Sequence, residues 1–155
     1  MTVVYAGICP VGEEKALAWR LLALAAEREY GLTPLPRVER LPGGKPWFPD
    51  CPALHFNLSH SRGGAVCALS GQPVGVDVEL RRQPPRRLSA DMEPAAFWRL
   101  WTGREATVKR TGRGLAALRE TPRPDPLCQW REDLLPGYTA AVCPADGEEI
   151  RWVAV

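Results

Sequence analysis

The segment VGVDVEL, residues 74–80, is the stretch that decides the fold, because apolar and other residues alternate strictly along it. This alternation predicts a β-strand with one face in the core, since successive side chains of a strand point to opposite faces. Asp77 and Glu79 then point together away from the apolar face. Gly75 lies on their side of the strand, where a glycine indicates close approach by a ligand or by another backbone.

Working outward from this strand, apolar periodicity and turn residues predict a series of short elements. Two helices are expected, over Glu13–Tyr30 and Pro94–Arg110. Strands are expected over Thr2–Ile8, 54–59, Ala65–Ser70, Val74–Leu80, Leu127–Arg131, Tyr138–Cys143 and Ile150–Val155. The second to fourth of these strands are expected to form an antiparallel meander. The order β-α-β-β-β-α-β-β-β predicts an α+β fold with antiparallel sheets, in two pseudo-duplicated lobes that each pack a helix on a small sheet. We expect the lobes to span 1–80 and 81–155.

Length and composition exclude a large multidomain enzyme, because the chain has 155 residues, 45% of them hydrophobic. The formal net charge of +2 does not by itself indicate a nucleic acid or membrane partner. Eleven Lys or Arg against four Asp or Glu fall between Arg81 and Arg123, which indicates either a polyanionic partner or a solvated basic face. The five cysteines include no C-x-x-C pair, which argues against a disulfide framework and a zinc knuckle. Without a signal-peptide pattern or a long apolar run, we expect a cytoplasmic protein.

Three carboxylates and one lysine are the first candidates for chemistry. Asp77 and Glu79 offer oxygen ligands that suit a hard ion such as Mg²⁺, or they form a solvated polar strand face. Glu105 and Lys109 lie four residues apart and share a helix face. One possibility is that they form an ordinary helix ion pair. The other is that Glu105 adds a third carboxylate to the site and Lys109 binds an anion there.

Two further motifs contain polar or basic residues beside glycines. Ser59 and His60 lie at the end of an alternating strand and precede Gly63 and Gly64. This arrangement suits either phosphate binding or a loop in which the histidine makes structural hydrogen bonds. A Ser-His-Asp hydrolase is disfavoured because no G-x-S-x-G elbow is present. The loop Gly43-Gly44-Lys45-Pro46 offers a backbone that can approach a ligand and a lysine charge, but it lacks the spacing of a P-loop.

Taken in order, the segments GKPWFP, HFNLSHS, VGVDVE and LWTGREATVKRTGRGL resemble the Sfp-type 4′-phosphopantetheinyl transferases. Members of that family transfer the phosphopantetheine arm of coenzyme A to a serine of an acyl or peptidyl carrier protein. The resemblance implies that fold and a holo-[acyl-carrier-protein] synthase type of activity. It also implies Mg²⁺, or Mn²⁺, as the metal and coenzyme A as co-substrate.

The resemblance also assigns roles to individual positions. It implies metal ligands at Asp77, Glu79 and Glu105, and coenzyme A contacts at Lys45, Ser59, His60 and Lys109. It makes Asp77, Glu105 and Lys109 the catalytic residues, with Lys109 at the diphosphate and Glu105 taking the serine proton directly or through a metal-bound water.

The chain departs from the family in length. It lacks most of the segment between the first strand and the first helix, where basic residues that hold the 3′-phosphate commonly lie; Lys15 or Arg20 could replace them. The alternative function is that of a degenerate, non-catalytic relative that binds coenzyme A or a carrier protein. We expect a monomer with no nucleic acid or membrane partner.

Overall fold

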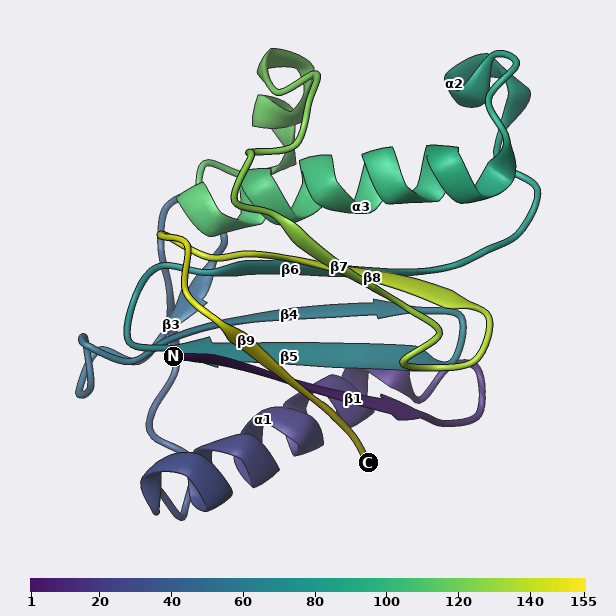
Figure 1. The fold of residues 1–155 in the computed structure, drawn as a ribbon. Coiled ribbons are helices and arrows are strands. Elements are labelled where there is room, and N and C mark those ends of the chain that lie inside the picture. The colour runs from purple at the N-terminus through teal and green to yellow at the C-terminus, as the bar shows by residue number, and fades with distance from the viewer.

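The computed structural model describes residues Met1 to Val155 as two sheets placed between two long helices (Figure 1). The helices are α1 (Glu14–Tyr30), the short α2 (Arg86–Ser89), α3 (Pro94–Thr111) and a 3₁₀ helix, η1 (Leu115–Glu120). The strands are β1 (Thr2–Ile8), β2 (Glu39–Arg40), β3 (Pro46–Trp47), β4 (His55–Ser61), β5 (Gly64–Ser70), β6 (Gly75–Leu80), β7 (Gln129–Glu132), β8 (Tyr138–Cys143) and β9 (Ile150–Ala154). The protein is therefore of the α+β class, as the sequence predicts.

The first sheet has the strand order β4-β5-β1-β9 and is covered on one face by α1. The apolar face of the helix, including the fully buried Leu22, packs against Tyr5 and Phe56 from the strands. Gly31 ends the helix in a left-handed conformation with φ of 65°, which glycine adopts without steric cost. The amphipathic pattern of 14–30 thus serves core packing.

The second sheet has the order β6-β8-β7, with antiparallel pairs throughout, and α3 lies on it. The predicted meander of three consecutive strands is wrong at its third strand, because β6 pairs with β8 and not with β5. The side chains of Asn57 and Ser59 accept hydrogen bonds from the backbone N–H groups of Val76 and Val78. Side chains of β4 therefore accept hydrogen bonds from backbone N–H groups of β6, although the two strands do not pair through their backbones.

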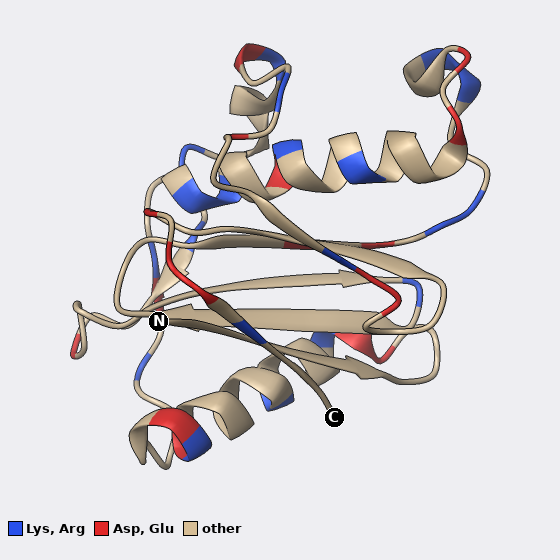
Figure 2. Ribbon diagram, in the orientation of Figure 1, with Lys and Arg blue, Asp and Glu red and all other residues tan.

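The apolar face of β6 packs against the first sheet. Val76 and Val78 share a buried cluster with Val4 and Val66, so the valines of the 74–80 segment fill the space between the two sheets. The opposite face of β6 then points toward α3. Figure 2 shows the acidic positions of β6 as red segments beneath that helix.

The two sheets do not divide the chain at residue 80, where the sequence places the boundary between its lobes. β6 precedes that boundary but joins the second sheet, and β9, near the C-terminus, joins the first sheet parallel to β1. The segment 33–52 contains only the two-residue strands β2 and β3. No helix combines the length and the apolar character that crossing a membrane requires. The pseudo-duplication of the lobes stays a prediction.

Candidate active site

Gly75 sets the distance between α3 and β6. A Cβ atom at this position would lie 1.9 Å from the carbonyl oxygen of Ala106 and 2.4 Å from the amide nitrogen of Arg110. Both are backbone atoms of α3. Of the two explanations for this glycine, close approach by a ligand or by another backbone, the structure therefore shows the second. This close approach places the side chains of α3 above the carboxylate face of β6.

The centre of the candidate site is a hydrogen-bonded cluster of Asp77, Lys109 and Ser59. The Lys109 ammonium donates to Oδ1 of Asp77 at 2.8 Å, and the Ser59 hydroxyl donates to the same oxygen at 2.8 Å. Lys109 also lies within hydrogen-bond distance of the serine oxygen, at 3.2 Å. Asp77 is only 3% exposed, so its charge relies on these partners rather than on water.

Ser59 links this cluster to the backbone of β6. Its oxygen accepts a hydrogen bond from the N–H of Val78 at 3.2 Å while its hydroxyl donates to Asp77. Two residues further along β4, the Ser61 hydroxyl donates to Glu79 at 2.8 Å. Each of these two serines of β4 thus donates a hydrogen bond to one carboxylate of β6.

Burial and mutual repulsion control the ionisation of the remaining carboxylates. Burial, and then the charge of Asp77, raise the pKa of Glu105 to about 7 and also raise the pKa of Glu79. For Lys109, burial acts to lower the pKa, but Asp77 and the other carboxylates outweigh it and raise the pKa above its ordinary value. The ammonium of Lys109 is 4.0 Å from Glu105, so the helix pair expected from the sequence forms within the site.

The chemistry of these side chains fits a divalent cation. The Oδ2 atom of Asp77 is buried and has no hydrogen-bond partner, and an orphaned carboxylate oxygen is a suitable ligand for a hard ion. Burial, and then repulsion from Asp77, raises the pKa of both Glu79 and Glu105, and a bound cation would offset both effects. The side chains are nevertheless not gathered into a ready group of three metal-ligating residues.

Lys45 lies apart from the Asp77 cluster and already has two partners. Its ammonium donates to the carbonyl oxygens of Val74 and Arg110, each at 2.9 Å. Arg110 belongs to the last turn of α3, where carbonyl groups lack partners within the helix. Through these two hydrogen bonds, Lys45 connects its loop to the residue before β6 and to the last turn of α3.

The glycines beside Lys45 complete this attachment. A Cβ atom at Gly43 would lie 1.9 Å from the carbonyl oxygen of Gly112, directly after α3. The Gly-Gly-Lys loop and the glycines after the helix, which the sequence presents as separate motifs, thus contact each other. Together with Lys109 they line a cavity of about 200 Å³.

His60 lies at a neighbouring cavity of about 160 Å³, which Lys15 and Arg40 also line. Of the two basic residues expected to replace the missing phosphate contacts, Lys15 is found at this cavity, whereas Arg20 does not line it. Arg40 was missed in the sequence because it lies in a segment without apolar periodicity. The cluster of Lys15, Arg40 and His60 provides three groups that can face an anion.

Comparison with known proteins finds several relatives that share the name 4′-phosphopantetheinyl transferase. A 4′-phosphopantetheinyl transferase of Bacillus subtilis is 32% identical over 115 residues, which cover 62% of this chain and 50% of that protein. The transferase Sfp of B. subtilis strain 168 is 29% identical over 66% of this chain and 60% of its own length. The transferase AcpT of Salmonella typhi is 37% identical over 66% of this chain and 62% of its own length.

These matches leave part of each relative uncovered, since the chain spans about 50–62% of their lengths. No profile of a known protein family matches the chain. The matched relatives nevertheless share one name, and the four sequence segments lie together around Asp77, Lys109 and the Gly-Gly-Lys loop. By sequence, the chain is similar to several 4′-phosphopantetheinyl transferases, Sfp and AcpT among them.

Proposed function

We propose that the protein transfers the 4′-phosphopantetheine arm of coenzyme A to a serine of an acyl or peptidyl carrier protein. In this reaction the serine oxygen forms a bond to the phosphorus nearer the pantetheine, and the bond from that phosphorus to the diphosphate bridging oxygen breaks. The other product is 3′,5′-adenosine diphosphate. The names of the relatives support a phosphopantetheinyl transferase, and the carrier serine as acceptor is part of the proposal.

The observation that carries the proposal is the buried cluster of Asp77, Lys109 and Ser59. Asp77 holds the Lys109 ammonium at 2.8 Å, on the side of α3 that borders the cavity of the Gly-Gly-Lys loop. A fixed ammonium in a mostly buried site stabilises negative charge much better than a lysine in water does. Lys109 is thus suited to the charge that develops on the departing adenosine diphosphate.

Glu105 is the group best suited to receive the serine proton. A pKa of about 7 keeps a useful fraction of its carboxylate ionised at neutral pH while leaving it basic enough to accept a proton. Its side chain lies one helical turn from Lys109, so acid-base and charge-stabilising groups come from the same face of α3.

The cavity of Lys15, Arg40 and His60 is our candidate for the phosphates of the adenosine end. Its three basic side chains can compensate anionic oxygens, and it shares Leu58 and Pro46 with the cavity that contains Lys109. A ligand could thus extend from one cavity to the other. This arrangement would supply phosphate contacts that the shortened segment before α1 does not.

Asp77, with Glu79 and Glu105, would hold the Mg²⁺ ion, and the orphaned Oδ2 atom of Asp77 supports this assignment. When bound, the ion would neutralise the diphosphate and act as a Lewis acid.

The proposal is tested by incubating the protein with coenzyme A, Mg²⁺ and several apo carrier proteins, and weighing the carriers by mass spectrometry. We expect one carrier or more to gain the mass of a phosphopantetheine arm. The non-catalytic alternative predicts binding of coenzyme A without a mass gain on any carrier, and that result would overturn the proposed activity.

A further inference from the structure

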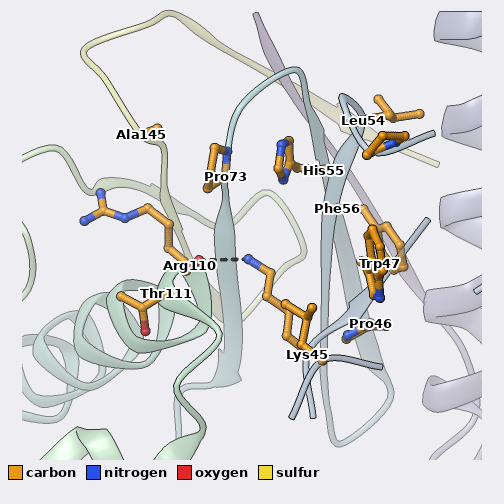
Figure 3. A pocket seen from close by; sticks show the side chains of 12 residues that line it. Lys45, Pro46, Trp47, Leu54, His55, Phe56, Pro73, Arg110, Thr111 and Ala145 are labelled. Atoms are coloured by element: carbon orange, nitrogen blue, oxygen red, sulfur yellow. Dashed lines mark hydrogen bonds between the residues drawn. The ribbon is translucent and has the colours of Figure 1, made fainter. Parts of the chain in front are cut away.

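A third cavity, of about 540 Å³, lies at the end of the molecule where β4 begins and α3 ends (Figure 3). It is lined by the Lys45 loop with β3, the start of β4, the turn before β6, the last turn of α3 and the segment after β8. Its volume falls within the range of roughly 300–1,000 Å³ that is typical of small-molecule sites. Asp77, Lys109 and His60 do not line it, but Lys45 and Pro46 line both this cavity and the smaller cavity of Lys109, so the two cavities adjoin.

The walls of this cavity present flat, apolar surfaces. Trp47 lies on the side opposite Arg110, with the almost fully buried Phe56 beside it, and proline rings at Pro46 and Pro73 add further flat faces (Figure 3). Phe56 is held in place by its packing on Phe48, with ring centroids 4.4 Å apart. Aromatic and proline faces of this kind favour a planar ligand over a bulky aliphatic one.

The charged groups of the cavity are all basic, since Lys45, His55 and Arg110 line it and no Asp or Glu does. The guanidinium of Arg110 points away and is neutralised by Asp125 at 2.8 Å. The Lys45 ammonium has only two neutral carbonyl partners and no carboxylate, so its charge is buried without compensation. An ammonium has three N–H donors, which leaves one for a ligand.

The ionisation of these side chains agrees with an uncompensated positive site. Burial, and then Arg110, lower the pKa of Lys45 to about 8, and burial followed by Lys45 lowers the pKa of His55. No carboxylate contributes to either shift. A bound anion would restore the ordinary preference of Lys45 for its charged form.

We propose that this cavity binds a small aromatic carboxylate, with the ring against Trp47 and the carboxylate on the ammonium of Lys45. The neutral imidazole of His55 can donate a second hydrogen bond to the carboxylate. The site adjoins the Asp77 cluster without sharing a residue with it, so binding here is measured without any transfer activity.

The test compares two probes of the same shape, 2-naphthoate and the neutral 2-naphthalenemethanol, by NMR of the ¹⁵N-labelled full chain. We expect millimolar 2-naphthoate to shift the amide signals of Trp47 and His55 and to bind about tenfold more tightly than the alcohol, because only the acid pairs with Lys45. In the Lys45→Met variant the preference should vanish. Lys15→Met, which removes a lysine from a different cavity, should leave it unchanged.

The probe pair keeps the test decisive even where Lys45→Met fails to fold. Equal binding of the two probes, or the absence of shifts at Trp47 and His55, would overturn the proposal. Displacement of 2-naphthoate by coenzyme A would also overturn it, because the cavity would then belong to the coenzyme A site. None of these outcomes depends on carrier modification, so failure here is distinct from failure of the proposed activity.

Discussion

Replacement of Gly75 by alanine tests whether the backbone contact between β6 and α3 positions the candidate active site. The added Cβ atom would lie 1.9 Å from the carbonyl oxygen of Ala106 and 2.4 Å from the amide nitrogen of Arg110. These are backbone atoms of α3, so the clash is relieved only by moving the helix away from the sheet. Overpacking of this kind costs about 1–3 kcal/mol, and we expect the upper end because no flexible side chain can yield.

The matched control is Gly71→Ala, because a Cβ atom at Gly71 meets nothing within 4 Å. At about 2–4 °C per kcal/mol for a chain of this size, Gly75→Ala should lower the thermal unfolding midpoint by roughly 6–12 °C. Gly71→Ala should change it by about 2 °C or less. The transfer activity of Gly75→Ala should also fall at a temperature where it remains folded, since Lys109 moves with α3. If both variants unfold at the same temperature, the reasoning about this contact is wrong.

Two further predictions concern side chains that bind backbone groups. Ser59→Ala should destabilise the protein by about 1–3 kcal/mol in denaturant unfolding, because it leaves the N–H of Val78 without its acceptor. Ser61→Ala, which removes only a partly exposed contact, should cost less than about 1 kcal/mol, and equal costs would contradict this assignment. For Lys45, whose pKa falls from 10.5 to about 8 on folding, the unfolded chain binds more protons between those values. The free energy of unfolding should therefore rise between pH 8 and 10.5, relative to Lys45→Met, by at most about 3 kcal/mol; a flat difference would show that Lys45 keeps its ordinary pKa.

Local patterns in the sequence predict the elements well because each pattern has a direct structural cause. The period-two alternation of 74–80 requires a strand with one buried face, and the structure forms β6 there with its valines in the core. The apolar spacing and the final glycine of α1 likewise predict a helix that ends at residue 30. These features depend on residues a few positions apart, so one sequence suffices to recognise them.

Strand pairing and site contacts depend on partners far along the chain, which local patterns do not encode. The alternation of 74–80 cannot distinguish β5 from β8 as a partner, because either presents an apolar strand. The carbonyl partners of Lys45 are 29 and 65 residues away, and main-chain groups leave no signature in the sequence. The sequence therefore suggests a ligand for Lys45 but not its two backbone partners on β6 and α3, and the ligand stays a prediction.

The central claim is that the Asp77 cluster is the centre of phosphopantetheine transfer. The most direct measurement is the rate at which an apo carrier gains the arm with Asp77→Asn, which keeps the shape of the side chain and removes its charge. The control is Glu27→Gln, which also removes one negative charge but lies at an exposed position of α1. We predict that Asp77→Asn remains folded and loses transfer by about a hundredfold or more, whereas Glu27→Gln keeps the full rate. Transfer by Asp77→Asn at the rate of Glu27→Gln would contradict the assignment of this cluster.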